Sequence, residues 1–523
     1  MSFLEDLKQR KIFQWAVAYL AGAWLVMQLI DVLGARWGIS DNTARFIDVA
    51  LIVGLFATLV IAWYHGDQGQ QRVSGPELLI IASLFAVGGL AVTILHFKDG
   101  TPATAETSAQ QSVPSDEKPW IAVLPFEVQS DDPDLENFAG GLTEDISNGL
   151  SDFSYLLVLS RTAVSGFHAV STDVRLIGKE LGARYVLQGS LRRAGPVTRI
   201  TAQLVDARNG TQVWAETFDR ELADANILAV QDELTDRIVA TVADPAGVVV
   251  RTLAAPTDRR APEDLTPYEA VLRYFLFRQR LSTQDHLITR SALEKAVERD
   301  PGYSDAWACL SLLYQDEHMN NLNPQPNSLE RALTAAQRAV DIDAANSFAQ
   351  FTLAQAHYFM KDIGAFRIHA ERAIQLNQRN SDTMAMVGIL MGYSGDWNRS
   401  VELTTRAMEI NPQHAGWYNF NTFFNEYRQH HSAEALAIAK KINMPDYWGT
   451  PLALAVSYAQ LGNEEAARDA AEDLRRIWPT VEQDYYQMGL VNWVFGQPEL
   501  IEQVNEDLRK AGINLVVPEE LKD

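Results

Sequence analysis

The 523-residue chain contains a single cysteine, Cys309, and far fewer basic than acidic residues. One thiol cannot form an intramolecular disulfide or build a cysteine-rich zinc site. The 67 acidic residues outnumber the 44 basic residues and give a formal net charge of −23, which repels nucleic acid phosphates. The composition therefore argues against DNA binding. The length argues for several domains, because a single hydrophobic core stops growing at a smaller size.

The motifs of nucleotide binding and hydrolysis are also missing. The stretch "PWIAVLPFEVQSDD" (residues 119–132) begins as many nucleotide-binding α/β domains do, yet neither Gly-x-Gly-x-x-Gly nor Gly-x-x-x-x-Gly-Lys follows it. Gly140-Gly141 at the start of an expected helix offers amide groups to an anion, but we favour an ordinary turn into a helix there. With no His-Glu-x-x-His and no local Ser/His/Asp motif, we expect no enzymatic activity and no cofactor.

Two clusters of possible metal ligands are better explained without a metal. His430-His431 has no carboxylate cluster beside it, and adjacent side chains point apart on a helix, so a solvated loop is favoured. The acidic residues between 131 and 136 resemble a calcium loop only loosely, because the Gly at the sixth position and the terminal Glu are missing. We therefore predict no metal site.

Three long apolar stretches predict a membrane anchor. Phe13–Ile30 and Leu78–Leu95 contain no charged residue, and Phe46–Tyr64 contains only Asp48. Each stretch approaches the ~20 apolar residues that a membrane-spanning helix needs. We expect three transmembrane helices within residues 13–97.

The basic residues around these stretches favour one orientation by a narrow margin. Lys8, Arg10 and Lys11 precede the first span, which makes residues 1–12 a cytoplasmic tail and places the chain after the third span outside the cytoplasm. Small residues four apart in the spans, such as Ala18 and Gly22, allow helices to approach closely. Packing within one three-helix bundle is favoured over a homo-oligomer interface.

A small α/β domain is expected at residues 119–245, after a flexible linker at 98–118 that is rich in Thr, Ser, Ala, Pro and Gln. The expected strands are 121–126, 156–159, 185–192, 197–205 and 212–218. The expected helices carry apolar residues at helical spacing within 142–150, 174–181 and 227–238. A second linker is predicted at residues 246–266.

Four motifs in this region, "IAVLPF", "FAGGLTEDISNGLS", "LIGKELGARYVLQGSLRRAG" and "RITAQLVDARNGTQVWAETFDR", give a family resemblance. Residues 120–244 resemble the FlgO-like domain, which is similar to the amino-terminal domain of the envelope protein TolB. The resemblance implies a non-enzymatic domain on the outer side of a bacterial inner membrane. Such domains often connect membrane spans to tetratricopeptide repeats, behind an adenylate cyclase or a CadC-type DNA-binding output domain. Only twelve residues precede Phe13, so we expect neither output domain here.

The last half of the chain is repetitive. The segments "EKAVERDP", "QRAVDIDA", "ERAIQLNQ" and "TRAMEINP" align on Ala296, Ala339, Ala373 and Ala407, and the last two intervals are both 34 residues, the tetratricopeptide period. The 43-residue first interval has extra residues in "NNLNPQPNS". We predict an all-α solenoid over residues 267–523, with about six repeats and a carboxyl-terminal cap.

The solenoid predicts a binding function. The first helix of such a repeat lines the concave face, and the repeat register places six side chains there: Phe351, Gln355, Tyr358, Asn419, Phe423 and Glu426. Aromatic rings beside amide groups suit an internal segment of an extended peptide. The alternative is that some of these rings pack between helices as core.

These observations predict a non-enzymatic scaffold that is anchored in the bacterial inner membrane. Its soluble domains are expected in the periplasm, where the solenoid would bind protein or peptide partners. The alternative is a ligand sensor that acts through a separate cytoplasmic output protein.

Overall fold

A computed structural model describes most of the chain after residue 117. The described residues are 118–130, 132–167, 173–222, 226–488, 490–494 and 496–518. All of them belong to the second of two units into which the chain divides, Ser112–Asp523. The predicted tail, the three membrane spans and nearly all of the first linker lie outside the described residues.

Within the described residues, one stretch, Ile227–Arg259, is long and apolar enough to cross a membrane, with a mean hydropathy of 1.5. Two thirds of its most apolar part (67%) is buried inside the protein, and the stretch includes a core helix of the α/β domain. Its apolar character is therefore explained by core packing.

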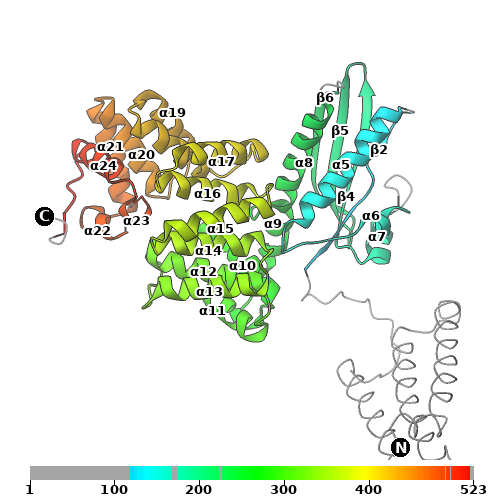
Figure 1. Ribbon diagram of the computed structural model, residues 1–523, viewed down its shortest axis with the longest axis horizontal. Coiled ribbons are helices and arrows are strands. Elements are labelled where there is room, and N and C mark those ends of the chain that lie inside the picture. Colours follow the sequence, from blue (N-terminus) through cyan, green and yellow to red (C-terminus); the bar gives the residue numbers. More distant parts are fainter. Residues whose placement is uncertain are drawn as a thin grey trace, which may run out of the picture. The chain divides into compact units, whose positions relative to one another are not determined.

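The α/β domain is built on a mixed sheet with the strand order β3-β1-β4-β5-β6. Figure 1 shows β4, β5 and β6 side by side. Its strands are β1 (Trp120–Val123), β2 (Glu127–Val128), β3 (Leu157–Val158), β4 (Tyr185–Ala194), β5 (Val197–Asp206) and β6 (Thr211–Glu221). β1 runs parallel to β3 and β4, the short β2 also pairs with β4 in parallel, and β4, β5 and β6 form an antiparallel meander. Asn209 and Gly210 form the turn between β5 and β6, where Gly210 takes a φ of 74°.

Helices cover both faces of the sheet at β1. The domain helices are α5 (Pro133–Ser151), α6 (Arg161–Val164), α7 (Val174–Leu181) and α8 (Ile227–Ala243). Ile121 and Val123 pack with the buried faces of α5 and α8, whereas Ala122 and Leu124 pack with residues of α6 and α7. A strand covered on both faces needs apolar residues at every position, which explains the continuous run "IAVL".

Helix α5 begins earlier than the sequence predicts. The side chain of Asp132 caps the helix by accepting backbone N–H groups of Asp134 (3.1 Å) and Leu135 (3.4 Å), and Pro133 occupies the first turn. A capping carboxylate followed by proline is a stronger start signal than paired glycines. Gly140-Gly141 therefore lie inside the helix, so the predicted turn is wrong and these residues offer no helix terminus to an anion.

The segment predicted as a second linker, residues 246–266, is folded instead. It contains α9 (Val248–Ala254) and the short 3₁₀ turns η1 (Ala255–Arg259) and η2 (Pro262–Asp264). The valines that open α9 are buried in the same core as α8 and the first solenoid helices. An apolar run of this kind gains more from packing than from remaining exposed.

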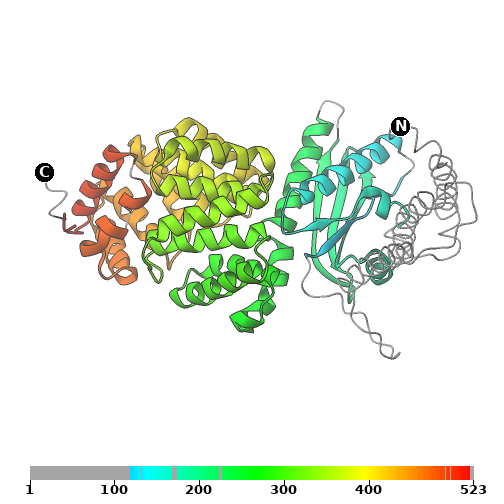
Figure 2. The ribbon, with the colours of Figure 1, turned by 60° about the horizontal axis from the view of Figure 1, so that its bottom comes forward.

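Six helix pairs form the solenoid (Figures 1 and 2). The first helices of the pairs are α10 (Pro267–Arg280), α12 (Ser304–Met319), α14 (Ser347–Phe359), α16 (Ser381–Tyr393), α18 (Asn419–Arg428) and α20 (Gly449–Gln460). The second helices are α11 (Thr283–Arg299), α13 (Ser328–Ile342), α15 (Ile363–Leu376), α17 (Trp397–Ile410), α19 (Ser432–Ile442) and α21 (Glu464–Ile477). They are followed by α22 (Val481–Met488), α23 (Leu490–Trp493) and α24 (Pro498–Lys510). The prediction of a tetratricopeptide-like solenoid beside a small mixed-sheet domain is confirmed.

Local sequence signals set the ends of these helices. Thr266 and Glu269 form a reciprocal capping box around Pro267 at the start of α10. In the turn "SGDW" between α16 and α17, Gly395 takes a φ of 100°, and Asp396 then caps α17 by accepting a first-turn N–H at 3.2 Å. The four alanines that define the repeat are all buried, because a small side chain lets neighbouring helices approach closely.

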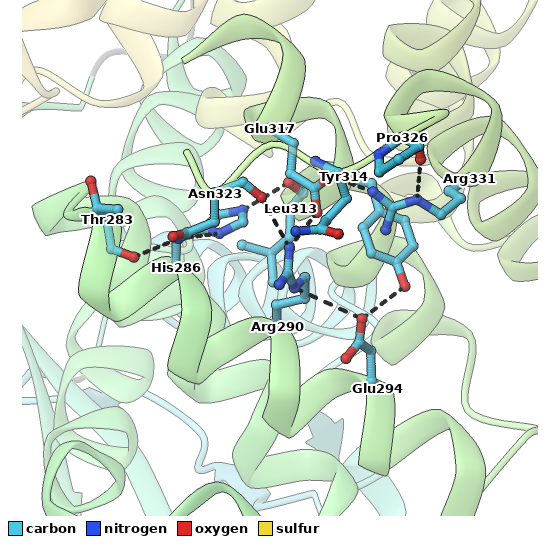
Figure 3. Close-up of polar contacts among 11 residues, drawn as sticks. Thr283, His286, Arg290, Glu294, Leu313, Tyr314, Glu317, Asn323, Pro326 and Arg331 are labelled. Carbon is cyan, nitrogen blue, oxygen red and sulfur yellow. Dashed lines mark hydrogen bonds and ion pairs between the residues drawn. The ribbon is translucent and has the colours of Figure 1, made fainter. Parts of the chain in front are cut away.

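The long first interval is closed by a polar network between α11, α12 and α13 (Figure 3). The carboxylate of Glu317 is fully buried and binds the guanidinium groups of Arg290 (2.7 Å) and Arg331. The side-chain amide nitrogen of Asn323, within the extra loop, lies 3.3 Å from Nδ1 of His286, and the backbone carbonyl of Asn323 accepts from Arg290 at 3.2 Å. These contacts hold the loop of residues 320–327 against the helices.

Buried polar contacts also join the α/β domain to the solenoid. Asp236 of α8 binds both Arg379 (3.1 Å) and Arg406. At the end of α8, Asp244 accepts a hydrogen bond from the hydroxyl of Ser381 in α16. Because one continuous core also includes both parts, they form a single packed unit. The sequence analysis did not predict this junction.

Candidate partner-binding pocket of the solenoid

The first helices of the later repeats direct apolar side chains into a common pocket with a volume of about 130 Å³. Met386, Ile389 and Tyr393 follow one another at spacings of three and four along α16. Phe420 and Phe424 are four apart on α18. Residues three or four apart share one face of a helix, so each helix presents a single apolar stripe to the pocket.

Aromatic residues outside the regular helices complete the wall. Trp417 belongs to the 3₁₀ turn η3 (Gly416–Tyr418), and Tyr447 and Trp448 lie in the connection between α19 and α20. The ring of Tyr447 lies 5.8 Å from that of Phe420 and 5.3 Å from that of Trp448. Trp493, contributed by α23 after the last repeat, also lines the pocket. The pocket therefore assembles residues from repeats far apart in the chain.

The lining of the pocket includes one charged residue. Arg278, near the end of α10, lies 3.6 Å from the buried carboxylate of Asp316 on α12. Burial raises the pKa of Asp316, and the Arg278 charge opposes that rise. Asn320, which also lines the pocket, donates to Asp316 at 2.8 Å. Since Arg278 already has a carboxylate partner, the pocket favours a neutral apolar group over an anionic one.

The six side chains predicted to bind a partner lie near this pocket in sequence but do not line it. Five of the six are buried, and the sixth, Glu426, keeps a quarter of its side-chain surface exposed: Phe351 7%, Gln355 4%, Tyr358 0%, Asn419 8%, Phe423 0% and Glu426 25%. Gln355 therefore lies in the core, although its side chain is polar. Partner binding through these six residues stays a prediction.

The register of α18 explains the difference at this helix. Phe423 stacks on Tyr427 at 5.6 Å and is directed into the core, whereas its neighbour Phe424 lines the pocket. Adjacent residues point about 100° apart around a helix, so a register error of one residue exchanges core for pocket. The i, i+4 pair Phe420/Phe424 and the aromatic loops "GWY" and "YWG" were the signals that could have located the pocket.

A second, larger cleft of about 590 Å³ lies in the α/β domain. It runs between α5 and α6 at the carboxyl ends of β1 and β3, the usual position of ligands in open parallel sheets. Gly140 lines it, and Glu144 and Arg161 form an exposed ion pair of 2.9 Å at its rim. No phosphate-binding glycine loop accompanies the cleft.

Metal ligands do not gather in the part of the chain that the structure describes. No group of three or more His, Cys, Asp or Glu residues there is arranged to hold an ion. His430 and His431 are exposed, and His431 approaches Glu426 at 2.7 Å.

Comparison with known proteins gives two partial sequence matches. Residues 117–237 match the family described as "HilA/YgeH-like transcriptional regulator, second domain". A protein of Rhizobium meliloti (strain 1021) that bears the name adenylate cyclase 3 is 38% identical over 248 residues, which are 47% of this chain and 41% of that protein. The chain thus spans about two fifths of the length of this curated relative. The FlgO-like resemblance stays a prediction.

Solved structures resemble the solenoid at low sequence identity. The protein YrrB, described as a tetratricopeptide-repeat protein with an unusual peptide-binding site, is 19% identical and has a TM-score of 0.26. The match covers 36% of this chain and 93% of the YrrB chain. Pseudomonas aeruginosa PilF is 16% identical and has a TM-score of 0.31, and the match covers 41% of this chain and 92% of the PilF chain. Scores of this size carry no functional argument, so function has to be argued from the chain itself.

Proposed function

We propose that this protein is a membrane-anchored, non-enzymatic scaffold that holds a segment of a protein partner by one aromatic side chain. The observation that carries the proposal is the pocket lined by Tyr393, Trp417, Phe420, Tyr447 and Trp448. Aromatic walls give a large contact area at a low cost in side-chain entropy, and buried aromatic anchors dominate the energetics of many interfaces.

The size of the pocket defines the anchor. A dry cavity of about 150 Å³ lined by apolar residues is known to take up benzene. A pocket of about 130 Å³ therefore suits one aromatic ring. Met386 and Met444 are flexible and polarisable, so they adapt the wall to anchors of different shape. The remainder of the partner segment would lie along neighbouring helices.

Site-specific photo-crosslinking tests this function. Trp417 is half-buried in the pocket, and replacing it with p-benzoylphenylalanine places the reactive group where the anchor would sit. Tyr458 on α20 is also half-buried but does not line the pocket, which makes it the matched control. We expect a discrete protein adduct in native membranes from position 417 and none from position 458. Equal adducts at both positions, or none at 417, would contradict the proposal.

The membrane anchor and the periplasmic location belong to the same proposal. The support is the three uncharged stretches in residues 13–97 and the basic residues ahead of them. With Cys309→Ala removing the native thiol, Ser112→Cys provides a single label site beyond the third stretch. We expect an impermeant thiol reagent that crosses only the outer membrane to label intact cells. Labelling that requires lysis would reverse the orientation.

A further inference from the structure

One carboxyl group lies on the face of α16 that lines the pocket. Asp382 precedes Met386 by four residues, and Met386 is followed at helical spacing by Ile389 and Tyr393. Residues three or four apart share one face of a helix, so Asp382 extends the pocket-lining stripe by one turn towards the start of α16. Every other residue of α16, a helix that the structure describes in full, is buried, whereas Asp382 is only half-buried. The stripe therefore ends in a carboxyl group that a ligand can reach.

The carboxylate of Asp382 has neither a hydrogen-bond donor nor an ion-pair partner among the described residues. Burial raises the pKa of Asp382, and the charge of Arg278 opposes that rise. A carboxylate that has lost part of its hydration is normally compensated by a cation or by hydrogen bonds. This side chain lacks that compensation within the part of the chain that the structure describes.

Three fully buried carboxyl groups of the same packed unit are compensated. Asp316 lies 3.6 Å from the guanidinium of Arg278, and Asp305 lies 3.6 Å from the ammonium of Lys118. Burial raises the pKa of Asp244 to about 8, so this side chain is protonated and neutral at pH 7. The carboxylate on the α16 stripe thus adds a negative charge beside a pocket whose lining includes one cation, and that cation is already paired.

We infer that Asp382 determines which partner segments bind, and that such a segment carries a lysine or arginine about two residues from its aromatic anchor. This inference rests on the proposed function. The separation follows from geometry, because four residues of helix rise about 6 Å and an extended segment advances about 3.3 Å per residue. The long stem of either basic side chain lets its charge reach the carboxylate while the neighbouring ring fills the pocket. Charge-assisted hydrogen bonds of this kind are stronger than neutral ones.

The alternative role for Asp382 is structural. It lies in the first turn of α16, where a negative charge interacts favourably with the helix dipole. Glu434 occupies the first turn of α19 in the same way, but its side chain is exposed and does not line the pocket. Glu434→Gln therefore removes a comparable first-turn charge away from the proposed site, which makes it the matched control.

The test uses the photo-crosslinker at position 417 of the full-length chain in native membranes. Asp382→Asn keeps the shape of the side chain and removes its charge, and Asp382→Lys reverses the charge. We expect the adduct yield to fall at least about threefold with Asp382→Asn, because a hydrogen bond to a charged group contributes about tenfold in affinity. The adduct should be lost with Asp382→Lys, and Glu434→Gln should leave the yield unchanged.

A charge exchange protects the result against a folding defect. Mass spectrometry of the adduct identifies the captured segment, which should contain a lysine or arginine within about three residues of the crosslinked position. Replacing that residue by Glu in the partner should restore the adduct of Asp382→Lys. Equal yields with Asp382, Asn and Lys at this position, or no restoration by the exchange, would overturn the role of Asp382 and leave the binding function standing. No adduct at position 417 with Asp382 intact would instead overturn the binding function, and the inference with it.

Discussion

Between pH 6 and pH 8 the free energy of unfolding of the protein should fall. Replacing Asp244 by Asn should remove much of this pH dependence. Asp244 lies at the junction of the α/β domain and the solenoid, where its carboxylate accepts from Ser381 and, at 3.4 Å, from Asn411. Burial raises the pKa of this carboxyl to about 8, with a further contribution from the negative charge of Asp382. The folded protein therefore keeps Asp244 protonated at neutral pH.

The magnitude follows from proton linkage. In the unfolded chain an aspartate titrates near pH 3.9, so between about pH 4 and pH 8 unfolding releases one proton from Asp244. The free energy of unfolding then falls as pH rises, by up to about 1.4 kcal/mol per pH unit, and becomes flat above the folded pKa. From pH 6 to pH 8 this amounts to about 2 kcal/mol. Asn mimics the protonated side chain and cannot ionise, so the variant should lack this component.

The assay is urea unfolding at pH 6, 7, 8 and 9, followed by tryptophan fluorescence. Asp232→Asn, an exposed aspartate on the same helix, is the matched control and should retain the pH dependence of the wild type. We expect Asp244→Asn to equal or exceed the stability of the wild type at pH 9. Parallel pH profiles for Asp244→Asn and the wild type would refute the buried, protonated carboxyl and with it this description of the junction.

Two further substitutions and one titration test the solenoid and the α/β domain. Glu317→Gln leaves two guanidinium groups without their buried carboxylate and should lower the free energy of unfolding by about 3 kcal/mol. The control, Glu294→Gln at the exposed end of the same network, should lower it by less than about 1 kcal/mol. Similar losses for both variants would contradict the network. Gly392→Ala would bring a Cβ to 2.6 Å from the Ser400 hydroxyl and should destabilise the protein by about 1 to 3 kcal/mol. The control, Gly364→Ala, meets only an ordinary 3.6 Å contact and should be neutral or stabilising. Denaturant midpoints distinguish the two variants, and an unchanged midpoint for Gly392→Ala would show that α16 and α17 pack less closely. Calorimetric titration of the full chain with ATP and GTP should give no binding heat, because the glycine loops are missing, and micromolar affinity would make the cleft beside Gly140 a nucleotide site.

Local signals in the sequence were sufficient for the coarse fold. The 34-residue spacing of Ala339, Ala373 and Ala407 predicted helix pairs, because each position requires a small residue where two helices meet. The apolar run that begins with "IAVL" predicted a strand for a similarly local reason. Where two local signals competed, as Asp132-Pro133 did with Gly140-Gly141, the stronger cap decided the helix start.

The pocket could not be read in the same way, because it depends on contacts between residues far apart in the chain. Helical periodicity places Phe423 and Phe424 on adjacent faces of α18, but only packing against α19, α20 and the following segments decides which face is core. The sequence by itself determined that these helices form and where most of them end. Only the tertiary structure decided that Asp244 is buried against the solenoid and that Trp493 returns to the pocket, since both contacts join residues more than a hundred positions apart.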